Sequence, residues 1–323
     1  AIIAICVFYI TRFAVLRKSF NTNRINLAYP ILIGSTMTIN TFFIIYKGAK
    51  GLGLDKTPLD IAFSVAFGVG GLAAIITIPL VPKLKNYVNK KFTDNNQTIE
   101  MVSIEEEIKT NKEELNIVNN KELERIINLH NDAEKFDKKT EEVFKYLQIF
   151  TAICDSFSHG ANDVANSIGP FATIWVIYQS GGKLDSKASM EGDAYWILGL
   201  GGIGIAVGLF VYGKKITRAI GEKLVKITPS RGVAIELSSA IVIITGSRLK
   251  LPLSTTHCQV GATVGVGLLE NHKNCSGINC KVFWKTAVGW IITCVVVGVT
   301  TALFISQGAY APSIYDNLSN CTL

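Results

Sequence analysis

An acidic residue flanked by two amides lies deep in an apolar stretch of the chain. Asp163 stands beside Asn162 and three residues before Asn166, within a polar, glycine-containing segment that runs from Ser158 to Pro170. A carboxylate, two amide oxygens and freed backbone carbonyls form a hard-oxygen site of the kind that binds Na⁺. We therefore expect a cation site here. The simpler alternative is that the Asn and Asp side chains only cap a half-helix.

A second polar break, Leu251–His257, interrupts another apolar run further along the chain. It carries three adjacent hydroxyls, on Ser254, Thr255 and Thr256, and Pro252 precedes them at a place where a helix can restart. Hydroxyls together with the unpaired N–H groups of a helix N-terminus suit an oxyanion. In the alternative, these hydroxyls only bond back to carbonyls of their own helix.

Ionisable side chains are scarce within the apolar runs and gather in or near these two breaks. Besides Asp163 they are Asp155, His159, Glu236, Arg248 and His257. An unpaired charge at the bilayer centre costs about 3 kcal/mol even on the mildest scale, and hydrocarbon cannot hydrogen-bond a broken backbone. Such groups persist where they line a cavity, bind an ion or pair with one another, as Glu236 would with Arg248. The sequence therefore indicates a solute pathway through a membrane.

The elements that must position these residues are transmembrane helices. Spanning about 30 Å of hydrocarbon takes roughly 20 apolar residues. Full spans are predicted at 27–46, 59–82, 194–213 and 282–306, with a shorter one at 1–16. Two more apolar runs, 143–180 and 232–269, are expected to be broken around 156–163 and 247–257. The predicted fold class is an all-α polytopic membrane protein with discontinuous or re-entrant helices.

Three regions follow from this pattern. Residues 1–82 hold the transmembrane helices that precede a central loop, and residues 146–323 hold a C-terminal region with both breaks. Between them, residues 83–145 form a hydrophilic loop in which apolar residues at near-helical spacing predict one or two amphipathic helices. Lys83 and Lys85 at its start favour the cytoplasm for this loop.

Composition supports a membrane protein and argues against a nucleic-acid binder. Hydrophobic residues make up 49% of the 323, and the mean hydropathy is +0.33. The net charge of +7 arises in short loops between apolar runs rather than along one soluble face. Gly199–Gly204 match a dinucleotide fingerprint by letter, but no strand precedes them, so they favour close helix packing. Cys275 and Cys280 flank a short loop and could pair if that loop is extracellular.

The two breaks together match a known family. The stretch His159–Pro170, read as H-G-A-N-D-V-A-N-S-I-G-P, closely resembles the signature of the inorganic phosphate transporter (PiT) family of sodium–phosphate symporters. Glu236–Ala240 followed by Leu251–Cys258 resembles a second part of that signature, and the order and spacing are similar to the family's C-terminal repeat. Residues 29–82 look like the helices ahead of its large central loop. The resemblance covers nearly all the chain except 83–145.

This resemblance implies an inverted-repeat secondary transporter in the plasma membrane, surrounded by lipid and often a homodimer. Each repeat would contribute one copy of both motifs. Since this chain shows one copy of each, we expect that an N-terminal repeat is missing. Carried over by matching position, Asn162, Asp163 and Asn166 would coordinate Na⁺ as a co-transported ion rather than a cofactor. Glu236 would join them, and Ser254, Thr255 and Thr256 would bind phosphate.

Rival functions remain open on the sequence alone. Carboxylates can carry H⁺ instead of Na⁺, so a proton-coupled transporter of phosphate or sulfate is the nearest alternative. A non-transporting phosphate sensor or receptor is another, with the 83–145 loop as its working part. An enzyme is the least favoured reading, because His159 and His257 are isolated and no nucleophile–base pair or closed metal-ligand set is visible.

Overall fold

The computed structural model describes residues 1–20, 23–46, 57–94, 120–181, 195–249, 251–270 and 277–310, and the regular elements within them are helical. The chain divides into two compact units, Ala1–Ile278 and Asn279–Leu323. The second unit contains α11 (Cys280–Tyr310). The helices of the first unit are α1 (Ile2–Thr11), the π-helix η1 (Arg12–Leu16), α2 (Arg24–Ile45), α3 (Leu59–Thr77), α4 (Leu80–Asp94), α6 (Asn120–Asp132), α7 (Lys138–Gln179), α8 (Tyr195–Arg218), the π-helix η5 (Ala219–Leu224), α9 (Pro229–Arg248) and α10 (Thr255–Leu268).

The predicted spans form long apolar helices. Within the described residues, four stretches are long and apolar enough to cross a membrane: Arg24–Ile45, Leu59–Thr77, Tyr195–Leu224 and Cys280–Gln307. They confirm the spans predicted at 27–46, 59–82, 194–213 and 282–306. Many of their large apolar side chains point outward, as Phe210 on α8 and Phe304 on α11 do. Apolar surface of this extent requires lipid around it, so the chain is an integral membrane protein.

The expected break around 156–163 is absent, and this prediction was wrong. α7 continues without interruption from Lys138 to Gln179, with Pro170 inside it. The polar residues of this stretch stay in the helix because their side chains find partners on neighbouring helices, so the backbone does not need to open. Pro170 has no N–H, so the carbonyl of Asn166 loses the partner that a helix would normally supply.

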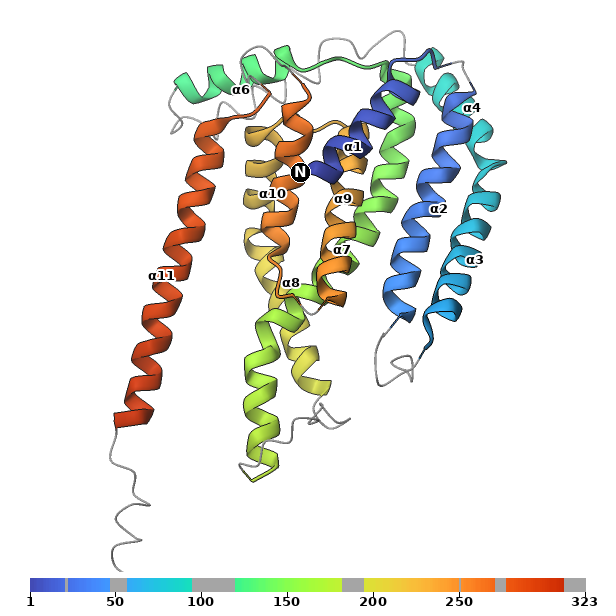
Figure 1. The fold of residues 1–323 in the computed structure, drawn as a ribbon. Helices are drawn as coiled ribbons and strands as arrows, with labels where there is room; N and C mark the ends of the chain where they lie inside the picture. Colours follow the sequence, from blue (N-terminus) through green and yellow to red (C-terminus); the bar gives the residue numbers. More distant parts are fainter. Residues whose placement is uncertain are drawn as a thin grey trace, which may run out of the picture. The chain divides into compact units, whose positions relative to one another are not determined.

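The second predicted break is confirmed. α9 ends at Arg248 and α10 begins at Thr255, with Ser254 in an extended conformation at its N-cap. Pro252 lies in the connecting segment, and the Ser254 side chain accepts a hydrogen bond from the backbone N–H of His257. α7, α9 and α10 pack against one another, so the interrupted pair α9 and α10 lies beside α7 (Figure 1).

In the part that the structure describes, the hydrophilic loop predicted at 83–145 contains most of α4, all of α6 and the first turns of α7. Only Ile78 and Pro79 separate α4 from α3, and Pro79 interrupts the helix there because it has no N–H to donate. α6 is strongly amphipathic. Lys91 of α4 pairs with Glu142 at 2.7 Å, and Lys139 donates to Asn89 at 3.0 Å. These contacts attach α4 to the first turns of α7.

The backbones of α2 and α3 approach closely at two glycines. A Cβ added at Gly70 would fall on the hydroxyl of Thr38 and lie 2.6 Å from the carbonyl oxygen of Gly34. The Thr38 hydroxyl in turn donates to that same carbonyl at 2.8 Å. Small residues allow helices to pack this closely in membranes, where dispersion forces replace the hydrophobic effect. Figure 1 shows the two helices side by side.

Adding one methyl group should therefore separate this pair. We expect Gly70→Ala to destabilise the protein by about 1–3 kcal/mol, because the new Cβ meets backbone that cannot move away. The measurement is the apparent melting temperature of the purified protein in detergent. Gly71→Ala is the matched control, since no atom lies within 4 Å of its added Cβ. Equal melting temperatures for the two variants would contradict the close packing.

An ionic cluster, buried around Arg231 and partly exposed at Arg17, connects one end of the first unit to the segment before α7. Its members are Arg12, Arg17, Glu134, Arg231 and Glu270, and we call it the Arg231 cluster. The fully buried Arg231 donates to Glu270 at 2.8 Å and to the carbonyl of Glu134 at 2.8 Å. The Glu134 carboxylate accepts from both Arg12 and Arg17. Residues from four separate segments are held together in this way.

The charge state of Glu134 follows from these partners. Burial raises the pKa of its carboxyl, but the hydrogen bonds from Arg17 and Arg12 outweigh that effect and hold the pKa below its ordinary value. A carboxyl with a lowered folded-state pKa stabilises the fold fully above its unfolded pKa. That stabilisation is lost as the pH falls through the folded value.

This linkage predicts an acid-sensitive contact. When the pH falls below about 4.5, the free energy of unfolding of the wild-type protein should decrease by about 1–3 kcal/mol, the amount that the charge-assisted bonds to Glu134 supply at neutral pH. Glu134→Gln should lack this contribution at pH 7. Its melting temperature should therefore fall less steeply between pH 7 and pH 3, the acid limb of the stability curve. Melting temperatures across pH 3–7 provide the measurement, with Asp132→Asn as the control because Asp132 is an exposed acid on the same segment. An unchanged acid limb in Glu134→Gln would count against the assignment.

Candidate functional site

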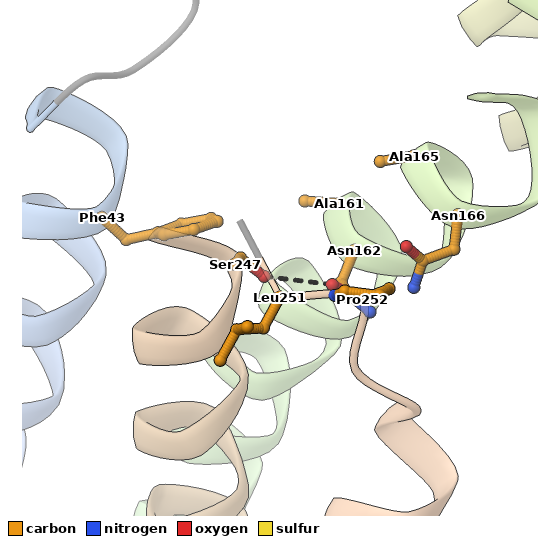
Figure 2. Close-up of a pocket in the computed structure, with 8 residues that line it drawn as sticks. All are labelled: Phe43, Ala161, Asn162, Ala165, Asn166, Ser247, Leu251 and Pro252. Carbon is orange, nitrogen blue, oxygen red and sulfur yellow. Dashed lines mark hydrogen bonds between the residues drawn. The ribbon is translucent and has the colours of Figure 1, made fainter. Parts of the chain in front are cut away.

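A cavity of about 460 Å³ opens where α2, α7 and α9 meet the break between α9 and α10. Figure 2 shows the residues that line it: Phe43, Ala161, Asn162, Ala165, Asn166, Ser247, Leu251 and Pro252. Asn162 and Asn166 come from successive turns of one face of α7. The polar stretch and the interrupted segment, distant in sequence, therefore form one site.

The two amides hold the interrupted segment in place. The Nδ2 groups of Asn162 and Asn166 donate to the carbonyl of Leu253, at 3.0 Å and 3.1 Å. The Ser247 hydroxyl, on the second-to-last residue of α9, donates to Oδ1 of Asn162 at 3.0 Å (Figure 2). Leu253 lies outside the helices, so its carbonyl has no helical partner, and the amides of α7 satisfy it.

Asp163 meets the first residue of α10. The Thr255 hydroxyl lies 2.9 Å and 3.0 Å from the two carboxylate oxygens, which accept its hydrogen bond. Asp163 is half-buried and Thr255 is buried, so this contact lies inside the protein rather than in bulk water. The N-terminus of a helix carries a partial positive charge, which also favours a carboxylate here. Of the predicted cation and oxyanion ligands, this is the pair that the structure brings into direct contact.

The three adjacent hydroxyls have different surroundings. Ser254 caps α10, and its Oγ also lies 2.6 Å from Nδ1 of His257. Thr255 faces Asp163, whereas Thr256 is exposed. The sequence predicted that the three hydroxyls form one set, but successive side chains at the start of a helix point in different directions. Only part of the set can face a single ligand at one time in this conformation.

The backbone adds one more oxygen. Because Pro170 cannot donate, the carbonyl of Asn166 is free of its usual helical bond. Asn162, Asp163 and Asn166 together supply one carboxylate, two amide oxygens and a backbone carbonyl without its usual helical donor. Hard oxygens with a single formal negative charge suit a monovalent cation such as Na⁺, while the N-terminus of α10 suits an anion.

Glu236 lies elsewhere. Its carboxylate accepts from Gln148 at 3.3 Å and from the hydroxyl of Thr151. Thr151 and Asp163 are twelve residues apart on α7, which corresponds to about 18 Å at 1.5 Å per residue. The structure thus does not bring Glu236 to the Asp163 site, and its role in binding Na⁺ stays a prediction. The side chain of Arg248, its proposed ion-pair partner, lies outside the described residues.

Further polar contacts continue along α7 between these two places. His159 Nε2 lies 3.2 Å from Asp155 and 3.0 Å from the hydroxyl of Ser239 on α9. The Ser158 hydroxyl donates to Asn40 of α2 at 3.4 Å. Sequence reasoning missed Asn40, although a lone amide within an apolar span was the available signal. It also missed Ser247 and the Leu253 carbonyl. The available signal for these two was their place within the predicted break at 247–257.

Comparison with known proteins points in one direction. Residues 1–301 match a family described as the phosphate transporter family. The chain is similar to sodium-dependent phosphate transporter 2 of Cricetulus griseus, with 40% identity over 182 residues that cover 55% of this chain and 27% of that protein. It is also similar to the phosphate-repressible phosphate permease pho-4 of Neurospora crassa, with 42% identity over 188 residues that cover 57% of this chain and 30% of that protein.

A solved structure shares the fold. The chain titled "The sodium-dependent phosphate transporter" matches with a TM-score of 0.64 and 26% identity, covering 90% of this chain and 58% of that one. The alignments with the two curated relatives span about a quarter to a third of their length.

Proposed function

The chain belongs to the phosphate transporter family, whose members are transporters rather than enzymes, and we propose that this protein carries inorganic phosphate across a membrane together with Na⁺. The observation that supports the proposal most directly is the hydrogen bond between Thr255 and Asp163, since it joins a candidate cation ligand to the start of a helix suited to an oxyanion. The names of the relatives agree with this substrate and this ion.

In this proposal Na⁺ binds to the Asp163 carboxylate and to the amide oxygens of Asn162 and Asn166. Phosphate binds at the N-terminus of α10, where the first backbone N–H groups lie together with the hydroxyls of Ser254, Thr255 and Thr256, of which only part can face it in this conformation. The amides that clamp the Leu253 carbonyl keep the two half-sites adjacent.

Electrostatics couples the two ligands. Without a cation, Asp163 would repel phosphate by about 3 kcal/mol for unit charges 5 Å apart at an effective dielectric constant of about 20. A bound Na⁺ neutralises the carboxylate and removes this penalty. Linkage is reciprocal, so phosphate should raise the affinity for Na⁺ by the same factor.

The Thr255 hydroxyl supplies a second, more local coupling. A hydroxyl has one proton to donate, and in this conformation Asp163 accepts it. When Na⁺ takes over the carboxylate, the proton becomes free for a phosphate oxygen. Cation binding thus prepares the oxyanion site as well as reducing the repulsion.

The remaining parts of the proposal rest on the family resemblance. Transport would use alternating access, with an inverted repeat moving against its counterpart, in a homodimer in the plasma membrane. Glu236, held by Gln148 and Thr151, would act at a separate place along α7 rather than in the Asp163 site.

Replacing the carboxylate tests the cation site. In the full-length protein, Asp163→Asn should lower the rate of Na⁺-dependent phosphate uptake into proteoliposomes by about 100-fold or more. The reason is that the neutral amide no longer supplies the charge that holds Na⁺. Surface expression serves as the control for insertion. Normal uptake by this variant would refute the assignment.

Removing one hydroxyl tests the oxyanion site. Thr255→Ala should raise the phosphate concentration for half-maximal uptake by about tenfold, which corresponds to the loss of one charge-assisted hydrogen bond. Thr263→Ala is the matched control, since its hydroxyl on the same helix only donates to the carbonyl of Gln259. If both variants keep the wild-type phosphate affinity, Thr255 does not bind phosphate.

Changing the ions separates the proposed function from its rivals. Phosphate uptake at constant pH should fall to background when Na⁺ is replaced by choline, and sulfate should not compete. Uptake that persists without Na⁺ but follows a proton gradient would favour H⁺ coupling instead. A complete lack of flux with intact phosphate binding would favour a sensor.

A further inference from the structure

A second cavity lies at the opposite end of α10 from the Asp163 site. Its volume is about 290 Å³, and it is lined by Tyr9, Arg12, Phe13, Arg17, Leu269 and Glu270. We call it the arginine cavity. α10 has 14 residues and so is about 21 Å long, which separates this cavity from Thr255 by roughly that distance. Nothing in the proposed transport mechanism uses it.

Three members of the Arg231 cluster, Arg12, Arg17 and Glu270, line this cavity, and the cluster as a whole carries an excess of positive charge. Of its five described side chains, three are guanidinium groups and two are carboxylates. Both carboxylates are already occupied. Glu270 accepts from Arg231 and from the N–H of Glu134, and Glu134 accepts from Arg12 and Arg17. One positive charge is therefore left without a counter-charge inside the cluster, which an anion could neutralise.

Arg12 also has an unmet hydrogen-bond donor. Its side chain lines the cavity, the residue is only 8% exposed, and its Nε–H has no hydrogen-bond partner in the described part of the chain. A buried donor without an acceptor is costly and rare, so it points to a missing acceptor. Arg17, whose side chain is 43% exposed, gives the cavity access to the outside.

The rim of the cavity is apolar and aromatic. Tyr9 and Phe13 are exposed and in contact with each other, and the Arg17 guanidinium stacks 4.6 Å from the centre of the Phe13 ring. They lie on the apolar helix formed by Ile2–Leu16, at the point where the chain passes into charged residues. Aromatic and cationic side chains gather in this way at the boundary between hydrocarbon and water.

We propose that the arginine cavity is a second anion site, which binds a phosphate group through Arg12 and Arg17. Planar guanidinium groups bind phosphate oxygens in pairs, and the cavity holds several times the volume of about 30 Å³ that one water occupies in the liquid. The phosphate group can belong to an anionic phospholipid, whose chains would lie along the aromatic rim, or be free inorganic phosphate. The site is independent of Na⁺.

The experiment measures binding to the purified full-length protein in Na⁺-free buffer. One arm titrates short-chain phosphatidic acid in detergent, and the other titrates inorganic phosphate, with native mass spectrometry and thermal shift as readouts. Arg17→Gln is the test variant, because Arg17 is the more exposed of the two arginines. Lys83→Gln is the matched control, since it removes one exposed positive charge on α4 outside the cavity. Phosphatidylcholine of the same chain length controls for the apolar part of the lipid.

We expect Arg17→Gln to weaken binding of at least one probe by about tenfold or more, while Lys83→Gln keeps the wild-type affinity. A loss in the phosphatidic acid arm alone identifies a lipid headgroup, and a loss in the inorganic phosphate arm alone identifies free phosphate. Arg17→Lys guards against a folding defect, because it retains the charge but not the planar fork. Wild-type affinity for both probes in Arg17→Gln, or equal losses in Lys83→Gln, would overturn the proposal.

Discussion

A carboxylate inside an apolar helix bundle needs a partner, and Asp163 finds one in Thr255, at the N-terminal turn of another helix. Much of the local architecture is arranged around that contact. α9 must end early so that α10 can begin beside α7, and the short segment between them must be held without helical hydrogen bonds. Asn162 and Asn166 provide that support through the Leu253 carbonyl. The same residues that interrupt the apolar pattern in sequence therefore stabilise the interruption in space.

The sequence was informative wherever apolar length alone decides the structure. Long apolar runs predicted the spans of α2, α3, α8 and α11, because burial in hydrocarbon depends on local composition. The break before α10 was also predictable, since Pro252 and the capping residue Ser254 are local signals. The break expected in α7 was not found. The side chains of this polar stretch find partners on α2, on α9 and α10 and in the segment between them, far away in sequence, so the helix does not have to open.

The site shows the same division. Residue types indicated which side chains could bind a cation or an oxyanion, but not which of them would meet. Thr255 rather than Ser254 or Thr256 faces Asp163, because the first turn of α10 sets their directions. The motif grouped Glu236 with Asp163, but in the structure Glu236 contacts Gln148 and Thr151 instead. The rise of α7 separates these two residues from Asp163. Such separations depend on helix register and packing, which a single sequence does not reveal.

The close approach of α2 and α3 at Gly34 and Gly70 has a mechanical consequence. Two helices whose backbones touch cannot slide past each other without breaking that contact. We therefore infer that α2 and α3 move as one rigid body. α2 also reaches α7 and the candidate site, through Asn40 at Ser158 and Phe43 in the wall of the 460 Å³ cavity. A tilt of this rigid pair would therefore displace the middle of α7 as well, whereas two loosely packed helices could absorb the movement between them.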